Sequence, residues 1–193
     1  MQTCAKAALA ALAFLIISCG GSSDDICGCQ PSESASADYR HAAKHVPLPA
    51  MVPQEITVHD MLAWTRPPEP PSDALRGGRE LKLFHIAHAF VQFVWLFHGD
   101  CDIHVEIADT PDKTAPRVIV ETPLDSEYCS ARRSLQSGLA RRGIRISEDF
   151  QELPQPVPAE VLGLAFQDFN HKRGSDFVAT VWELHPATVN LLP

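Results

Sequence analysis

The chain has 193 residues, of which 45% are hydrophobic and 21% charged, and its formal net charge is -8. These values are typical of a folded globular domain and exclude a wholly disordered or fibrous chain. Acidic residues outnumber basic ones, 24 to 16, which argues against a nucleic-acid partner without excluding one, because phosphate-backbone binders normally carry a basic patch.

The N-terminal segment has the features of an export signal. Lys6 precedes an apolar run over residues 7–17, which is too short to cross a bilayer. The run ends in the stretch IISCG at residues 16–20, which resembles a bacterial lipobox, a signal whose cysteine becomes the lipid-bearing N-terminus. We therefore expect residues 1–18 to be a lipoprotein signal peptide and Cys19 to be lipidated. An ordinary secretory signal cleaved nearby is the alternative, and both would export the protein.

Residues 19–80 are expected to form a tether followed by a proline-rich linker. Residues 20–25 are glycine, serine and aspartate, a composition typical of flexible segments, and the stretch RPPEPP at 66–71 favours a stiff polyproline-type backbone. Between them, residues 54–64 hold one short amphipathic piece. No aspartate directly follows Cys19, which by resemblance to the sorting of Gram-negative lipoproteins favours the outer membrane. We expect a globular domain outside the cytoplasm, held at a bacterial envelope membrane by the lipid.

Four cysteines follow the lipobox, namely Cys27, Cys29, Cys101 and Cys129. Export permits disulfides, but their pairing cannot be read from the cysteine count alone. Cys27 and Cys29 could bond to each other only under strain. A metal or redox site at this Cys-x-Cys motif is an alternative.

From residue 81 onward the sequence carries strand patterns. Residues 81–97 are apolar and rich in β-branched and aromatic side chains, which favours a long strand. The stretch IHVEI at 103–107 alternates apolar and polar side chains, as a strand with one buried face does. Apolar runs bounded by turn residues predict three further strands, at residues 117–122, 161–166 and 176–184.

A single strong helix pattern lies between the third and fourth predicted strands, at residues 130–142. Ser130 is placed to cap the start of this helix, and Gly143 is placed to stop it. We interpret its arginines as a solvated face. The prolines that follow it, Pro154, Pro156 and Pro158, predict another linker.

The order of three strands, a helix and two strands predicts a mainly β fold, a small OB-like five-stranded Greek-key barrel with its helix between strands 3 and 4. Another small barrel or an α+β sheet would also fit this order. In the OB-like barrel the first three strands form a meander, so the start of strand 2 lies beside the end of strand 3. Cys101 stands at the first place and Cys129 shortly after the second, and we therefore expect a Cys101–Cys129 disulfide.

Four short motifs place acids or histidines at strand ends: Asp102-Ile103-His104, Glu121-Thr122-Pro123, the segment from Asp168 to His171, and Glu183-Leu184-His185-Pro186. Alternation turns the apolar residues of these strands inward and His104, Glu121, Glu183 and His185 outward. The barrel places strand 3 beside strands 2 and 5, so these four side chains are expected to share one outer face. Asp168 and His171 would join them from strand 4 and the following loop.

Such a group could hold a divalent metal ion, zinc or another, or act as a general acid and base. The candidate metal ligands are Asp102, His104, Glu121, Asp168, His171, Glu183 and His185. Each motif taken alone is more often a structural hydrogen-bonded pair than part of a ligand site. His85 and His88 point opposite ways on a strand and are not expected to be ligands, and Trp95 and Phe97 are expected in the core.

The four motifs, in this order and spacing, resemble those of a group of bacterial exported proteins with no established activity. The resemblance covers residues 81–192, and the final Glu-Leu-His-Pro motif is its most specific part. It implies a common domain and a common site. In the loop after His171, Lys172 and Arg173 depart from the glycine-rich stretch of that group.

The sequence therefore favours an envelope-anchored lipoprotein whose OB-like domain, residues 81–193, binds an unidentified ligand, with a divalent metal as a possible cofactor. The alternative is a metal-dependent hydrolase of nuclease or phosphoesterase type that uses the His/carboxylate cluster. A structural envelope protein without a ligand site is a third reading. The chain has no Ser-His-Asp elbow and no phosphate-cradling glycine loop.

Overall fold

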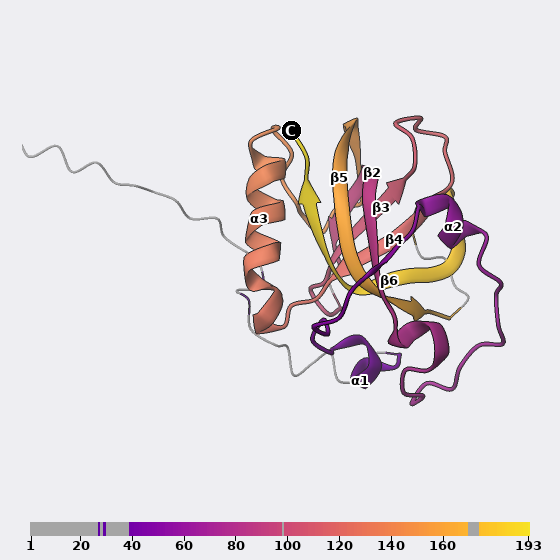
Figure 1. Cartoon of the computed structure of the whole chain (residues 1–193). Helices are drawn as coiled ribbons and strands as arrows, with labels where there is room; N and C mark the ends of the chain where they lie inside the picture. The colour runs from indigo at the N-terminus through magenta and orange to yellow at the C-terminus, as the bar shows by residue number, and fades with distance from the viewer. Residues whose placement is uncertain (1–26, 28, 30–38, 98, 170–173) are drawn as a thin grey trace, which may run out of the picture.

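Five of the described strands form a barrel. The structure is a computed structural model that describes residues 27, 29, 39–97, 99–169 and 174–193. Its barrel strands are β2 (Leu83–Leu96), β3 (Ile103–Ala108), β4 (Arg117–Thr122), β5 (Gln151–Gln167) and β6 (Val178–Leu191) (Figure 1).

These five strands close into a barrel in the order β2-β3-β4-β6-β5, and β5 pairs back onto β2. All neighbouring pairs are antiparallel except β4 and β6, which run parallel. The helix α3 (Cys129–Ala140) lies in sequence between β4 and β5. This strand order, with α3 between β4 and β5, confirms the predicted OB-like barrel.

Alternation along β3 and β4 determines which side chains fill the barrel. Ile103, Val105 and Ile107 of β3 belong to the buried apolar core, together with Val118 and Val120 of β4. The residues between them, including those of the Asp-x-His and Glu-x-Pro motifs, lie on the outer side of the barrel wall. The predicted facing of these two strands is therefore confirmed.

β5 is longer than the sequence suggested, and it contains the prolines that were expected to form a linker. Pro154, Pro156 and Pro158 lie in the first part of β5, where the strand pairs with β2 alone. Pairing with β6 begins at Ala159. Because a proline has no N–H to donate, it is tolerated in a strand where one edge has no partner.

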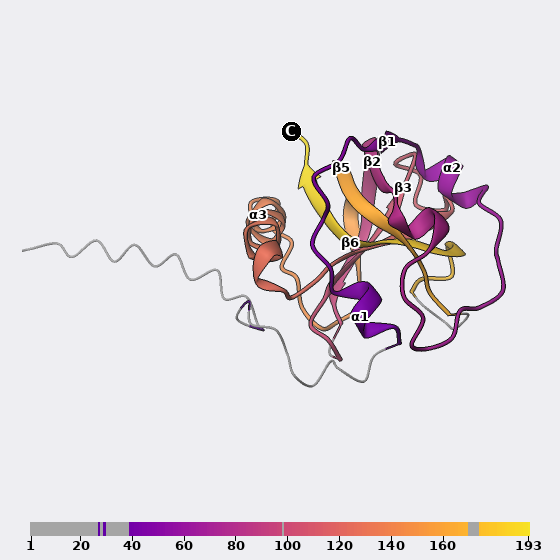
Figure 2. The same cartoon turned by 60° about the horizontal axis from the view of Figure 1, so that its bottom comes forward.

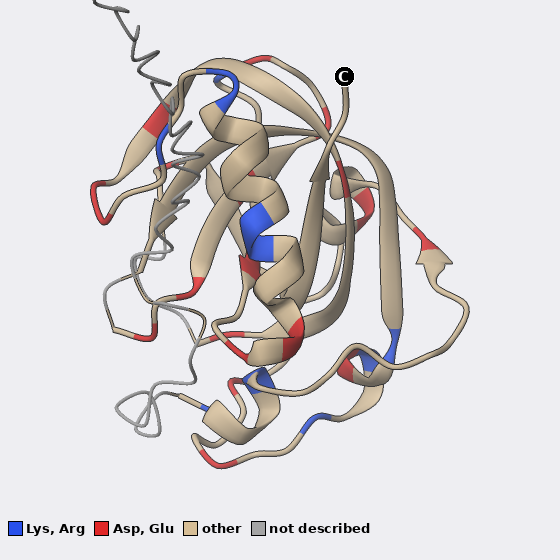
Figure 3. Cartoon of the chain, turned by 90° about the vertical axis from the view of Figure 1, so that its left-hand side faces the viewer, with Lys and Arg blue, Asp and Glu red and all other residues tan. Residues whose placement is uncertain are grey.

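The helix α3 begins one residue before its predicted start and has a different cap. Ser130 does not cap it, because the N-cap residue is Tyr128, at the end of a short 3₁₀ turn, and no side chain supplies a capping bond. Gly143, at a φ of 75°, follows the last turn in the left-handed region that favours glycine. Figure 3 views α3 with its basic residues in blue. Arg132 is buried and donates to the carbonyl of Thr122 at 2.9 Å, so the arginines of this helix do not all lie on the predicted solvated face.

Residues 39–80, expected to form tether and linker, contact the barrel instead. They include α1 (His41–Lys44), the two-residue strand β1 (Gln54–Glu55), α2 (Val58–Leu62) and the 3₁₀ helix η2 (Gly78–Leu81). Val58 and Met61 of α2 are fully buried. Figures 1 and 2 show α1 at one end of the barrel and α2 at its side.

A buried ion pair fixes both ends of residues 39–80, the covering segment, against the barrel. Arg40 is 2% exposed and binds Glu80 through two hydrogen bonds, of 2.7 and 2.8 Å. The backbone N–H of Gln167 in β5 also donates to Glu80, at 2.9 Å. Burial would raise the pKa of Glu80, but Arg40 and the backbone donors outweigh it and hold that pKa below its ordinary value. The pair therefore joins residues 40 and 80 to the barrel wall.

The disulfides differ from the expected pairing. Cys27 bonds to Cys101 and Cys29 bonds to Cys129, with Cα–Cα distances of 6.2 and 5.6 Å. The Cys101–Cys129 bond is therefore wrong, although both cysteines do bond to the same short N-terminal segment. Two disulfides indicate an oxidising, non-cytoplasmic compartment. Among the helices of the described residues, none is long and apolar enough to cross a membrane.

We expect this pairing to be found by mass spectrometry of peptides from a digest without reductant. In Cys27→Ser the partner Cys101 should become the one newly alkylated thiol, and in Cys29→Ser it should be Cys129. Each bond closes a long loop, of 74 or 100 residues, so losing one should lower the free energy of unfolding by roughly 2–4 kcal/mol. A peptide cross-linked between Cys101 and Cys129 would contradict the pairing.

Candidate functional site

Strand register brings the sequence motifs together on the outer barrel wall. His104 of β3 lies directly opposite Glu121 of β4 in the antiparallel pair. Glu183 of β6 pairs with Ile119 of β4 in the parallel pair, and His185 lies two residues farther along the same face. The parallel β4–β6 contact, which only the barrel topology supplies, therefore joins the last motif to the first two.

Glu121 is the hub of the resulting network. Its Oε1 accepts a hydrogen bond from His104 Nδ1 at 2.8 Å, and its Oε2 accepts one from His185 Nδ1 at 2.7 Å. The ammonium of Lys44, in α1, lies 3.9 Å from Oε2. Because an ionised carboxylate only accepts hydrogen bonds, both histidines must carry their proton on Nδ1.

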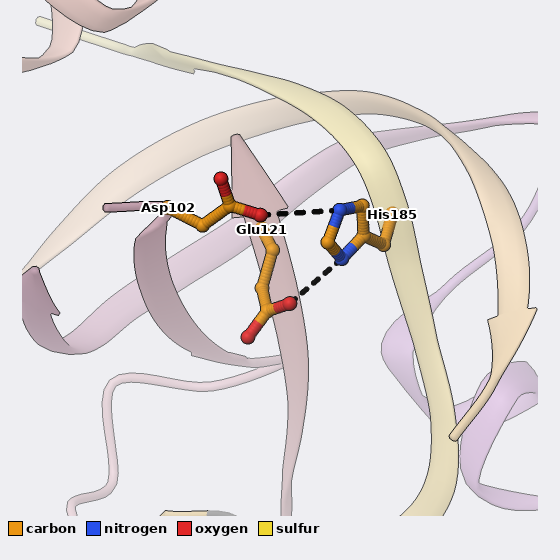
Figure 4. A group of neighbouring side chains, drawn as sticks. All are labelled: Asp102, Glu121 and His185. Atoms are coloured by element: carbon orange, nitrogen blue, oxygen red, sulfur yellow. Dashed lines mark hydrogen bonds and ion pairs between the residues drawn. The ribbon is translucent and has the colours of Figure 1, made fainter. Parts of the chain in front are cut away.

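His185 lies between carboxylates on both sides of its ring. Figure 4 shows Glu121 at one ring nitrogen and Asp102 at the other, where Nε2 is 3.2 Å from Asp102 Oδ2. Glu183 Oε1 is 3.5 Å from Nδ1. Burial would lower the pKa of His185, but its contacts with Asp102, Glu121 and Glu183 raise it well above the ordinary value. The ring is therefore an imidazolium that partly neutralises the surrounding acids.

The other titratable groups respond to the same accumulation of charge. Burial opposes the ionisation of Glu121, but Lys44 and the two histidines keep its pKa well below the ordinary value. Burial also opposes the charge on Lys44, yet the nearby carboxylates, led by Glu121 and Glu183, raise its pKa. Asp100, buried beside Asp102 and Glu121, has its pKa raised to about 8. The site thus stabilises positive charge and protonated acids.

Backbone and aromatic contacts hold these side chains in place. The N–H of Leu124 donates to Asp102 Oδ1 at 3.1 Å, and the N–H of Asp102 donates to Asp100 Oδ1 at 2.9 Å. The indole of Trp95 stacks on the ring of His104 with centroids 3.4 Å apart. Arg76 donates to the carbonyl of His185 and, at 2.7 Å, to that of Ala165, which joins β6 to β5 below the site.

A cavity of about 790 Å³ opens over this face. It lies on β3 and β4, between the β2–β3 loop and the β5–β6 loop. Three of its aromatic rings are exposed: Phe97 and Phe150 by 49% each, and Phe177 by 37%. The lining residues that the argument below uses are aromatic (Tyr39, Trp95, Phe97, Phe150, Phe169, Phe177), acidic (Asp100, Glu121, Asp168, Asp176, Glu183) or basic (Lys44, His104).

The β5–β6 loop is held against the barrel by a second buried ion pair. Arg117 binds Glu106 at 3.1 Å, and both side chains are fully buried. The N–H of Ser175 donates to Glu106 Oε1 at 2.6 Å, and its hydroxyl donates to Oε2 at 2.5 Å. A Cβ on Gly174 would lie 2.3 Å from Glu106 Oε1, so only glycine permits this approach. The pair therefore fixes the wall of the cavity that carries Phe177.

Three of these residues could hold a metal ion. One ligand atom from each of Asp102, Glu121 and His185 lies within 4.8 Å of the others, and all three are buried. Imidazole and carboxylate are ligands of zinc and other divalent ions. His104 adds to the fit, because its Nε2 is buried and makes no hydrogen bond with any residue that the structure describes. A metal bound to His185 would have to displace one of its protons.

The sequence located most of this group. The structure brings together Asp102, His104, Glu121, Glu183 and His185. Asp168 lines the cavity but is not among the three residues within metal-binding distance, and His171 lies outside the described residues.

Sequence reasoning misplaced some residues near the site and missed others. Trp95 and Phe97 were expected in the core. Trp95 is buried, as expected, and also lines the cavity beside His104, whereas Phe97 is 49% exposed at the cavity. Lys44 was missed because α1 was assigned to the tether, and no local pattern marks it. Asp100 was missed although it lies two residues before Asp102, where the aspartate pair was a usable signal. His85 binds Glu55 at 2.8 Å, outside the site, as expected.

Comparisons of the chain with family models, curated proteins and solved structures find no match to any of the three. The resemblance to exported proteins with the same four motifs stays a prediction. The argument about function rests on the geometry of the site.

We expect Glu121→Gln to destabilise the protein by about 3–5 kcal/mol, as measured by urea unfolding at pH 7. The change leaves Lys44 and His185 with less counter-charge, and breaking one side of a buried ion pair carries a cost of this size. The exposed Glu127→Gln is the matched control and should stay within about 0.5 kcal/mol of the wild type. A Glu121→Gln protein as stable as the control would show that the network around Glu121 carries little energy.

Proposed function

We propose that the protein is an exported, lipid-anchored binding protein whose OB-like barrel takes a small ligand in the cavity over β3 and β4. The observation that carries the proposal is the position of this cavity. OB-fold proteins bind ligands on the outer face of their second and third strands, flanked by the loops between strands 1 and 2 and between strands 4 and 5. Here those elements are β3, β4, the β2–β3 loop and the β5–β6 loop, and all four supply lining residues.

The lining of the cavity supports a ligand rather than a purely structural role. Exposed aromatic rings are unfavourable in water unless something covers them, and here three of them border one concave, partly polar site. The charged network beneath is pre-organised by β-strand register. These features are typical of a binding pocket with an apolar wall and a few directed polar groups.

The anchor is the second part of the proposal. It rests on the lipobox at Cys19 and is supported by the disulfides, which fit an exported protein. Cys27 follows Cys19 by eight residues, which reach at most about 29 Å. The bond from Cys27 to Cys101, next to Asp100 of the cavity, would therefore keep the cavity end of the barrel near the membrane. An unmodified N-terminus on the mature chain, by intact mass, would contradict the anchor.

A divalent metal ion at Asp102, Glu121 and His185 is the second candidate. It is supported by the spacing of these ligand atoms and by the buried Nε2 of His104. Such an ion would also meet the first requirement of the alternative function, a metal-dependent hydrolase. The binding proposal is favoured because both ring nitrogens of His185 already contact carboxylates, so a metal ion would have to displace a proton that is held there.

Thermal shift assays of the purified chain test the binding proposal. The panel contains amines, amino acids, sugars, nucleotides and the ions Zn²⁺, Mg²⁺ and Ca²⁺. We expect at least one organic compound to raise the melting temperature, because a ligand that binds only the folded state stabilises it by mass action. Phe177→Ala should reduce that shift, since Phe177 borders the cavity, whereas Leu81→Ala, an exposed residue outside it, should not.

The same panel separates the candidates. A shift by a metal ion that Asp102→Asn abolishes would support the metal site. Hydrolysis of a nucleotide or phosphoester that requires that ion would favour the hydrolase instead. If no compound binds, or if binding is unaffected by Phe177→Ala, the proposed binding function of this cavity is wrong.

A further inference from the structure

We infer that the ligand of this cavity is an organic cation. Its primary ammonium group lies beside Glu121 and Glu183, which form the acidic floor of the cavity, and its apolar part lies against Phe97, Phe150 and Phe177, which form the aromatic rim. The inference rests on the proposed binding function and adds the chemical class of the ligand. Three separate observations support it, namely the charge of the lining, an ammonium already bound there, and the orientation of His104.

The described lining is strongly acidic. Among the described lining residues are five carboxyl groups, one of which, that of Asp100, has its pKa raised to about 8, against one ammonium, that of Lys44. The imidazolium of His185 lies behind the floor and leaves an excess of negative charge. At short range and away from bulk water, this excess attracts a cation and repels an anion. A polyanion such as a nucleic acid is therefore a poor fit, in agreement with the net charge of -8.

Lys44 shows that the floor accommodates an ammonium group. Its side chain is 11% exposed, and its Nζ lies 3.9 Å from Glu121 and 5.6 Å from the ring centroid of Phe166. An ammonium between a carboxylate and the face of an aromatic ring gains from both the ion pair and the cation–π interaction. The same acidic lining would accept a second ammonium from a ligand.

His104 supplies a directed polar atom. Its Nδ1–H donates to Glu121, so Nε2 is the ring atom left to bond a ligand. Nε2 is buried and makes no hydrogen bond with the part of the chain that the structure describes, and a buried polar atom of this kind gains from a partner. A ligand in the cavity would supply this partner, and beside the carboxylate of Glu121 an ammonium group is the partner that the surrounding charge favours.

The aromatic rim suits the rest of such a ligand. Phe97, Phe150 and Phe177 are three of the seven exposed large hydrophobic residues in the described part of the chain, and all three border the cavity. An apolar group joined to the ammonium would cover these rings and remove them from water. A ligand with both parts, an amphipathic amine, therefore matches the cavity better than a hydrated metal ion or a fully hydroxylated sugar.

Isothermal titration calorimetry of the EDTA-treated chain with three matched probes tests this inference. The probes are 2-phenylethylammonium, its neutral analogue 2-phenylethanol, and the anion 3-phenylpropanoate. We expect the ammonium probe to bind at least ten-fold more tightly than the alcohol, and the anion to give no measurable binding. Equal affinity for ammonium and alcohol, or tighter binding of the anion, would overturn the inference.

Charge variants give a second, independent readout. Glu183→Gln should weaken binding of the ammonium probe about ten-fold, and Lys44→Gln should strengthen it, because the competing internal cation is gone. Glu160→Gln, an acid of β5 that is not among the lining residues, should leave the affinity unchanged. Should a buried variant fail to fold by circular dichroism, Asp176→Asn at the exposed rim replaces it, with weaker binding expected.

The outcomes keep the two proposals separate. If a sugar or another neutral compound binds in a Phe177-dependent way and the ammonium probe does not, the cation inference is wrong and the binding function stands. If Lys44→Gln weakens binding of the ammonium probe in a folded protein, the inference is also wrong. If neither the probes nor the wider panel bind, both proposals fail.

Discussion

The carboxylate of Glu121 is the point on which the site depends. It accepts hydrogen bonds from histidines on β3 and β6 and pairs with the ammonium of Lys44 from outside the barrel. A single buried carboxylate with three cationic or donor partners links β3, β4, β6 and the covering segment. Because an unpaired charge is costly at such a position, each partner needs the others, and the polar face of the barrel is fixed as a unit.

Two other constraints keep this unit in register. The disulfides hold the loop of Cys101 and the start of α3 to the N-terminal segment, and the Arg40–Glu80 pair holds residues 39–80 against β5. Both act on the segment that delivers Lys44. The Glu106–Arg117 pair fixes the opposite wall of the cavity. The hydrophobic core of a small barrel stabilises it only modestly, and here disulfides and buried ion pairs at the edges of the barrel add to that stability.

Local pattern was enough to predict the barrel and much of the site, and it failed where long-range contacts decide. Alternation in β3 and β4 gave the facing of His104 and Glu121, and the strand order gave the β4–β6 contact that adds His185. The partner of Cys101 could not be predicted, because a segment 74 residues away supplies it. The prolines of β5 are typical of a linker, and only the three-dimensional structure shows that they lie where β5 pairs with β2 alone. Lys44 could not be predicted, because no local sequence pattern marks it and only the tertiary structure brings it to Glu121.

An NMR titration of the ¹⁵N-labelled chain with 2-phenylethylammonium tests the central claim most directly, namely that the face around Glu121 is a ligand site. The account predicts amide shift changes concentrated at residues 97, 99–104, 119–121 and 174–177, which surround the cavity. Changes centred instead on the smaller cavity near Arg142 and residues 154–158 would contradict it, as would no changes at any concentration of the probe in the titration.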